Sequence, residues 1–180
     1  MASHTNRSIL TTALVACAIV AALWPAADAS SSCSPGNKEI VRRMYRQALN
    51  REPDSGGLRT YCSHLQSGRT VQSLFSPIVR SSEYREKFVY DRSTFFTVVN
   101  LYKVILGRCP NKEGLLHKER VLRGNCRGNF ESIVNNMFAS REYGHKFGSN
   151  LVPSPKPGPN QCPTGERPDF PNGIPSELKC

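Results

Sequence analysis

A stretch of 14 residues occurs twice in this chain and restricts the folds that the chain can adopt. The first copy covers residues 45–58 and the second covers residues 102–115. Both copies carry a Tyr, a Leu, an Arg, a Pro and a Gly-Leu pair at the same offsets. A helical run, a proline turn and the start of a second helix are therefore encoded twice, which indicates an internally repeated architecture.

The first copy lies across the end of one predicted helix and the beginning of the next. Pro53 disfavours helical geometry at the residue before it, so the first helix is expected to end near Asn50 or Arg51. Asp54 or Ser55 can accept hydrogen bonds from the free N–H groups of the next helix. The apolar stripe of the first helix is formed, at helical spacing, by Ile40, Val41, Met44, Tyr45, Ala48 and Leu49.

Three more helices are expected before residue 92. The second ends at Gly68, a residue typical of helix C-termini. The third carries apolar residues from Val71 to Val79, and Pro77 inside it predicts a kink or a break because proline lacks the N–H that a helix interior uses. Ser82 begins a short fourth helix that holds Tyr84.

The residues from 93 to 148 follow the same order. Asn111 stands where the first copy has Asp54, Gly124 matches Gly68, and Ser140 precedes a closing Tyr143. The offset between the copies changes along the chain, and a loop insertion around residues 125–129 accounts for the change. Since no strand pattern of useful length occurs, we predict an all-α fold of two tandem four-helix units, residues 30–92 and 93–148, packed together.

The two ends of the chain differ in composition from the repeats. Residues 149–180 are rich in proline, which excludes helices and strand ladders and predicts an extended tail. Residues 1–29 hold an apolar run followed by Ala27-Asp28-Ala29, the pattern of a secretory signal peptide cleaved near Ala29. The run is shorter than the ~20 residues of a membrane span. An uncleaved anchor and a lipoprotein box at Cys17 are weaker alternatives. We therefore predict a secreted protein with no transmembrane segment in the mature chain.

Six cysteines remain after the predicted cleavage. An even number in an exported chain predicts three disulfides, for which 15 connectivities exist. Zinc is the competing interpretation, but no two cysteines stand at C-x-x-C spacing, so we expect no metal and no cofactor. The predicted disulfide cysteines are Cys33, Cys62, Cys109, Cys126, Cys162 and Cys180.

The formal net charge of the chain is +10, and the surplus of basic residues falls on the repeats rather than on the tail. A basic surface favours acidic partners, which outside a cell are anionic glycans, acidic proteins or membrane surfaces; nucleic acid is disfavoured in that compartment. Solubility alone is an equally good explanation of the surplus. The anion-binding candidates are Arg42, Arg43, Arg46, Arg51, Arg59 and Arg108.

Two of these arginines, Arg51 and Arg108, occupy the same place in the two copies. They can bind an anion, but a structural role is favoured over that function. In that role they cap the last carbonyls of a helix or pair with Glu83 and Glu142. The change from Asp54 to Asn111 likewise suits a helix cap and weakens a role that depends on charge.

No set of residues suggests catalysis. His64, His117 and His145 lack acidic or nucleophilic residues at catalytic spacings, and no phosphate loop, H-E-x-x-H or G-x-S-x-G motif occurs. We predict that the protein is not an enzyme.

The paired motif resembles a helical family of bacterial and algal secreted or surface proteins, domain of unknown function 4214. It is also similar to the linker domain of phycobilisomes. The matching residues of the first copy are Tyr45, Leu49, Arg51, Pro53, Asp54, Gly57, Leu58, Tyr61, Ser67, Gly68, Ser81, Glu83 and Tyr84. The matching residues of the second copy are Tyr102, Leu106, Arg108, Pro110, Gly114, Leu115, Gly124, Ser140, Glu142 and Tyr143.

This chain departs from the family pattern at several positions. The aromatic residue after Gly-Leu, usually Trp, is Tyr61 in the first copy, and the second copy has His117-Lys118 there. The cysteines are not part of the pattern either. The resemblance implies an all-helical scaffold or interaction module without catalysis. The predicted export implies that this module acts outside the cell rather than in a phycobilisome.

Three hypotheses about function follow. The first is a secreted interaction module whose basic helical face binds an anionic partner, either an unknown protein or a glycan. The alternative is a structural linker that joins other proteins or associates with itself. The weakest is an enzyme with a polar cleft between the repeats. The oligomeric state is left open by the sequence.

Overall fold

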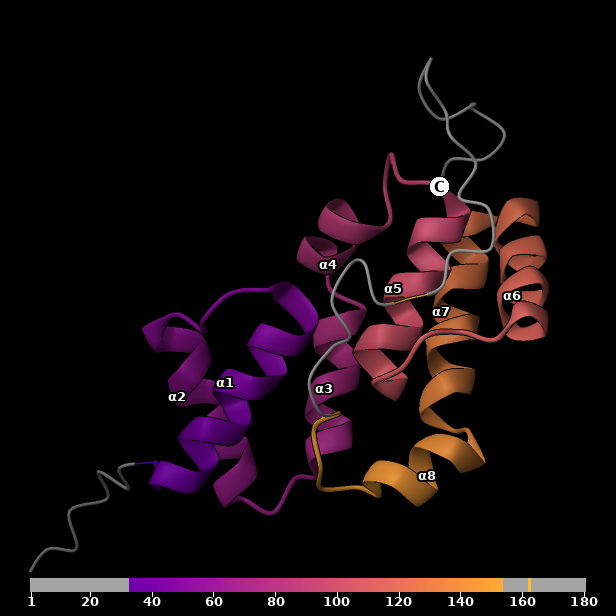
Figure 1. The fold of residues 1–180 in the computed structure, drawn as a ribbon. Coiled ribbons are helices and arrows are strands. Elements are labelled where there is room, and N and C mark those ends of the chain that lie inside the picture. The colour runs from indigo at the N-terminus through magenta and orange to yellow at the C-terminus, as the bar shows by residue number, and fades with distance from the viewer. Residues whose placement is uncertain (1–32, 154–161, 163–180) are drawn as a thin grey trace, which may run out of the picture. The chain divides into compact units, whose positions relative to one another are not determined.

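The computed structural model describes residues 33–153 and Cys162, and these residues form eight helices and no strand (Figure 1). The predicted all-α fold is therefore confirmed. The predicted signal peptide, most of the proline-rich tail and Cys180 lie outside the described residues. The helices are α1 (Pro35–Leu49), α2 (Ser55–Gln66), α3 (Val71–Val79), α4 (Ser82–Phe88), α5 (Thr94–Leu106), α6 (Lys112–Gly124), α7 (Cys126–Phe138) and α8 (Arg141–Phe147).

Each helix begins after a short polar residue whose side chain accepts a hydrogen bond from a backbone N–H of the first turn. This satisfies one of the donors that a helix start leaves unpaired. Asp54 and Asn111 cap α2 and α6 as predicted, each accepting from the glycine three residues later. The eight capping residues are Ser34, Asp54, Thr70, Ser81, Ser93, Asn111, Asn125 and Ser140.

Two local predictions differ from the structure. Helix α3 continues through Pro77 and ends two residues later, so the predicted break does not occur. The missing N–H and the ring of Pro77 affect only the turn before it, and α3 accommodates both without ending there. The predicted loop around residues 125–129 is wrong as well. Only Asn125 separates α6 from α7, and its side chain accepts from the Gly128 N–H, which starts α7 at once.

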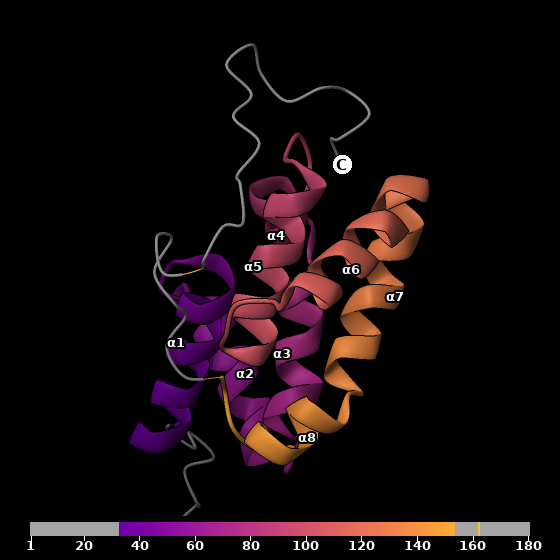
Figure 2. The same cartoon turned by 45° about the vertical axis from the view of Figure 1, so that its right-hand side comes forward.

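The helices of each half pack in a matching pattern. Helix α1 contacts α2, α3 and α4, and α5 contacts α6, α7 and α8 in the same way. The halves meet where α3 lies against α7 and α4 lies against α5 (Figures 1 and 2). The described helices belong to one compact unit with one buried apolar cluster. The boundaries 30–92 and 93–148, and the interpretation of the halves as tandem copies, stay predictions.

Buried polar side chains join the halves in addition to the apolar core. The Gln47 side chain on α1 donates to the carbonyls of Lys103 and Val104 on α5, at 3.0 and 3.1 Å. The Asn100 side chain on α5 donates to the Tyr84 hydroxyl on α4 at 2.9 Å. Such bonds satisfy groups that burial would otherwise leave unpaired, and so they select one arrangement of the helices.

Disulfide bonds link segments of the described chain that are distant in sequence. Cys33, just before α1, is bonded to Cys62 on α2, with their Cα atoms 5.6 Å apart. Cys109, between α5 and α6, is bonded to Cys162, with a Cα separation of 5.3 Å. Cys126 is disulfide-bonded too. Among residues 33–153, no helix combines the length and the apolar character needed to span a membrane.

Candidate interaction surface

A bidentate ion pair lies at the corner between α1 and α2, where Arg51 meets Glu83 at the start of α4. The Arg51 Nε and Nη2 atoms donate to the two carboxylate oxygens of Glu83, at 2.6 and 2.7 Å. Its Nη1 atom donates to the Glu52 carbonyl, and the guanidinium lies over the Tyr45 ring, 5.1 Å from the centroid. Planar, bidentate contacts of this kind are the strong form of an Arg–carboxylate pair.

The corner between α5 and α6 has the same construction. The Arg108 Nε and Nη2 atoms donate to the Glu142 carboxylate at 2.5 and 2.6 Å, and Nη1 donates to the Cys109 carbonyl at 2.8 Å. The guanidinium lies 5.1 Å from the centroid of the Tyr102 ring. Of the two structural roles considered for Arg51 and Arg108, the structure shows pairing with Glu83 and Glu142. Both guanidinium groups are thus occupied within the chain.

The same corners explain the glycines of the repeated motif. The Tyr45 hydroxyl lies so close to the start of α2 that a Cβ added at Gly57 would be 2.6 Å from it. A Cβ at Gly114 would be even closer to the Tyr102 hydroxyl. Glycine is needed at both positions because a tyrosine ring packs where any other side chain would begin.

The ion pairs shift the pKa values of their carboxyl groups. Hydrogen bonds from Arg108, and then from Lys146, lower the pKa of Glu142 to about 2. The hydrogen bonds from Arg51 also hold the pKa of Glu83 below its usual value. Both carboxylates are therefore charged at neutral pH, because a bonded cation stabilises the charged form.

Sequence reasoning found that His117-Lys118 replaces the aromatic residue in the second half, but it missed that Lys118 contacts Tyr102. Tyr61 on α2 makes an edge-on contact with Tyr45, with their ring centroids 5.6 Å apart. In the other half the equivalent partner is Lys118, whose Nζ lies 5.7 Å from the centroid of Tyr102. A cation thus occupies the place of the missing aromatic residue. The spacing could have predicted this contact, because Tyr61 follows Tyr45 by 16 residues and Lys118 follows Tyr102 by 16 residues.

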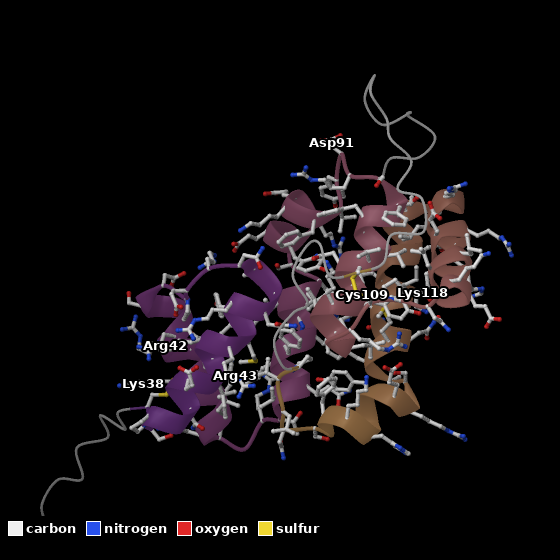
Figure 3. The ribbon with its side chains drawn as sticks, viewed as in Figure 1. Lys38, Arg42, Arg43, Asp91, Cys109 and Lys118 are labelled. Carbon is white, nitrogen blue, oxygen red and sulfur yellow. A yellow bond between two sulfur atoms is a disulfide. The ribbon has the colours of Figure 1, made fainter. Side chains whose placement is uncertain are left out.

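The arginines on α1 differ from the two corner arginines. Arg42, Arg43 and Arg46 are exposed, and Figure 3 labels the first two on α1. Arg46 forms ion pairs with Glu39 and Glu52, and Arg42 lies 3.9 Å from the Glu52 carboxylate. Exposed pairs of this type contribute at most ~1 kcal/mol to stability. No ion pair of Arg43, or of the exposed Arg59 on α2, is present in the described part of the chain.

A shallow groove of about 350 Å³ lies between α3 and α7. Its lining includes the hydroxyl groups of Thr70, Ser73 and Ser76, and its one charged residue is Arg80. The Arg80 guanidinium donates to the Asn135 side chain at 3.2 Å. The groove therefore offers no pair of titratable groups for acid–base chemistry. Within the described residues, no cluster of three or more His, Cys, Asp or Glu side chains is placed to hold a metal ion.

Comparison with known proteins identifies the family. Residues 34–156 match the family model described as phycobilisome linker polypeptide, which covers all eight helices. The chain belongs to the phycobilisome linker polypeptide family. The resemblance to domain of unknown function 4214 stays a prediction.

Individual linker polypeptides are similar to a large part of this chain. The phycobilisome 32.1 kDa linker polypeptide, phycocyanin-associated, rod 1, of Synechocystis sp. is 30% identical over 119 residues, 64% of this chain and 40% of that protein. The phycobilisome 39 kDa linker polypeptide, phycocyanin-associated, rod, of Microchaete diplosiphon is 28% identical over 133 residues, 72% of this chain and 43% of that protein. The chain thus spans less than half the length of these relatives.

The prediction that the protein is secreted is wrong. Phycobilisome linkers belong to a cellular assembly at the thylakoid membrane, and the family match contradicts an extracellular location. The prediction depended on an apolar run and a small-residue pattern in residues 1–29. Such a run is a local signal of composition. The match over residues 34–156 depends on many more positions, and it takes precedence.

Proposed function

We propose that this protein is a non-enzymatic structural linker that joins other proteins, and that its partner is a phycobiliprotein of the phycocyanin kind. The observation that carries the proposal is the family match over residues 34–156. The names of similar relatives describe them as phycocyanin-associated rod linkers, and this supports the choice of partner. The linking role that was the alternative hypothesis fits these findings better than an anionic glycan does.

The geometry of the corners supports a stiff connecting element. The Arg51–Glu83 pair ties the α1–α2 corner to α4, and the Arg108–Glu142 pair ties the α5–α6 corner to α8. The Lys87 Nζ atom also donates to the Leu49 carbonyl at the end of α1, at 2.6 Å. A module that holds two proteins at a defined spacing benefits from such fixed corners, because a rigid surface loses little entropy on binding.

We also propose that the two halves are copies of one structural unit. The matching Arg–Glu pairs, the matching Tyr–Gly contacts and the parallel caps at Asp54 and Asn111 support this reading. In a linker of this design, each unit would present one outer helix, α2 or α6, away from the shared core.

The proposed function is tested by mixing the purified protein with phycocyanin and measuring the mass of the species by size-exclusion chromatography with light scattering. We expect a complex heavier than either component. Ovalbumin, an unrelated acidic protein, serves as a control for unspecific attraction between charges. A mixture that elutes as two separate components at concentrations of tens of micromolar would contradict the proposal. Dilution of the protein alone reports self-association in the same instrument.

A further inference from the structure

The exposed face of α1 is a narrow basic strip. Glu39, Arg42, Arg43 and Arg46 are all exposed, whereas Val41, Met44 and Ala48 are fully buried. With about 100° of rotation per residue, the four exposed positions fall within an arc of ~100°. Figure 3 labels Arg42 and Arg43 on α1. We call Arg42, Arg43 and Arg46 the α1 arginine strip.

The matching face of α5 is covered by a helix. The two corner tyrosines are 57 residues apart, and so are the two corner arginines. The residue 57 positions after Arg43 is Asn100. The Asn100 side chain donates to the Tyr84 hydroxyl on α4, and the Thr97 hydroxyl donates to the Phe88 carbonyl at the end of α4. Both Thr97 and Asn100 are buried. This face of α5 is therefore a place where a short helix packs.

On α1 the same position carries an exposed arginine instead of a buried amide. Because Arg43 is exposed, no helix of the described residues covers it as α4 covers Asn100. We propose that the α1 arginine strip is the docking surface for an acidic helix of the partner protein, in the place that α4 takes on α5. This inference deepens the proposed linker function and rests on it.

Charge argues for a carboxylate-rich partner. The nearby carboxylates of Glu39 and Glu52 already pair with Arg42 and Arg46, yet these pairs are exposed and contribute little. Arg43 has no ion pair among the described residues. Guanidinium groups bind carboxylates through two parallel hydrogen bonds, so that a row of aspartates or glutamates on a helix fits this strip.

A second copy of this chain is a poorer occupant. The short helix that corresponds to α4 in the other half is α8, which exposes Arg141 and Lys146. Its carboxylate, Glu142, is already bound by Arg108 and Lys146. Placing α8 of one copy on the α1 arginine strip of another would bring like charges together, which opposes association.

A lipid surface is also disfavoured as the occupant. Helices that lie in a membrane interface combine basic residues with large exposed apolar residues. The large exposed apolar side chains in the described part of the chain are Phe96, Leu116 and Leu151, and none is on α1. The strip therefore lacks the apolar side chains that would insert among lipids.

The experiment compares two triple variants that each remove three positive charges. R42Q/R43Q/R46Q neutralises the strip, and K112Q/R120Q/R123Q neutralises exposed cations of α6. Glutamine keeps a helix propensity close to that of Arg and Lys, so both variants are expected to fold, and circular dichroism checks this. Wild type and both variants are titrated, at low and at near-physiological salt, with phycocyanin and with a designed helical peptide that carries Glu at every fourth position.

We expect R42Q/R43Q/R46Q to weaken binding of both probes roughly tenfold and to flatten the salt dependence. K112Q/R120Q/R123Q should change the affinity by less than about threefold. Equal losses in both variants, or a larger loss in the α6 variant, would overturn the inference while leaving the linker function intact.

The two probes separate the inference from the proposed function. If wild type binds the acidic peptide through the strip but does not bind phycocyanin, the choice of phycocyanin as partner fails and the docking surface stands. If wild type binds neither probe, both proposals are overturned. Binding of anionic vesicles that is lost in R42Q/R43Q/R46Q, with no binding of the peptide, would assign the strip to lipid and contradict the inference.

Discussion

Arg108 and Glu142 lie 34 residues apart in the sequence and form a bidentate ion pair that joins the α5–α6 corner to the first turn of α8. The pair is reproduced by Arg51 and Glu83 in the other half. Each pair also holds its guanidinium over a tyrosine ring that closes the corner. The repeated motif thus encodes a joint in which one arginine connects three elements.

Removing Arg108 should lower the free energy of unfolding more than removing an exposed cation such as Lys146. We expect R108A to lower the free energy of unfolding by about 1–2 kcal/mol, because the hydrogen bonds to Glu142 and to the Cys109 carbonyl are lost together. R108K should not restore stability, since an ammonium group cannot form the planar fork. Urea unfolding monitored by circular dichroism measures both. The control is K146Q, whose i,i+4 pair with Glu142 is expected to contribute only about 0.3–0.5 kcal/mol.

Stability should fall with acid in a way that depends on Glu142. Its pKa is lowered from 4.5 to about 2 by the hydrogen bonds from Arg108 and Lys146. A folded-state pKa below the unfolded value gives stability that is complete above the unfolded pKa and is lost as pH falls through the folded pKa. Wild type should therefore lose more stability than E142Q between about pH 5 and pH 2. Parallel curves for the two proteins in urea titrations across this range would contradict the assignment.

Alanine at Gly57 should be destabilising because of one hydroxyl group. An added Cβ would lie 2.6 Å from the Tyr45 hydroxyl, and relieving that contact should cost about 1–3 kcal/mol. In a Y45F background the G57A change should cost much less stability than it does in wild type, because phenylalanine lacks the hydroxyl. The comparison is between Y45F/G57A and Y45F. G144A on α8 is the control, since a Cβ there meets no atom within 4 Å. It should be neutral or stabilise by up to ~1 kcal/mol.

The two closing tyrosines should respond differently to loss of their hydroxyl groups. Y84F leaves the buried Asn100 side chain without its acceptor, and we expect a loss of about 1–3 kcal/mol. The Tyr143 hydroxyl is also buried but has no hydrogen-bond partner among the described residues. Y143F should therefore be neutral or slightly stabilising, since it removes an unsatisfied polar group. Thermal unfolding of the two variants side by side tests this order, and a larger loss in Y143F would contradict it.

The disulfide between Cys33 and Cys62 should stabilise the α1–α2 pair. It closes a loop with a sequence separation of 29, for which the chain-entropy model gives about 3–4 kcal/mol. C33S/C62S should lower the melting temperature under oxidising conditions. With dithiothreitol present, wild type should approach the variant as its own disulfides are reduced. A melting temperature of the variant equal to that of oxidised wild type would show that the bond adds nothing.

Much of the helical frame could be predicted because its signals are local. Asp54 and Asn111 are capping residues next to prolines, and the apolar stripe of α1 has a helical period; caps and periodicity act within one or two turns. The pairing of Arg51 with Glu83 was among the predictions because the same residues recur in both copies. Pro77 and residues 125–129 were misjudged, because a proline near a helix end and a cap such as Asn125 act through geometry that composition does not reveal.

Local patterns in the sequence were enough to predict that this chain is all-helical, where most of its helices begin and end, and that its two motifs form corners. The cysteine pairing, and the contact of Lys118 with Tyr102 in place of Tyr61 with Tyr45, became known from the tertiary structure. The difference comes from separation along the chain. Helix caps and apolar periods depend on neighbouring residues, whereas the disulfides and the Arg–Glu pairs join residues more than 25 positions apart, and the Lys118–Tyr102 contact depends on how two helices pack together.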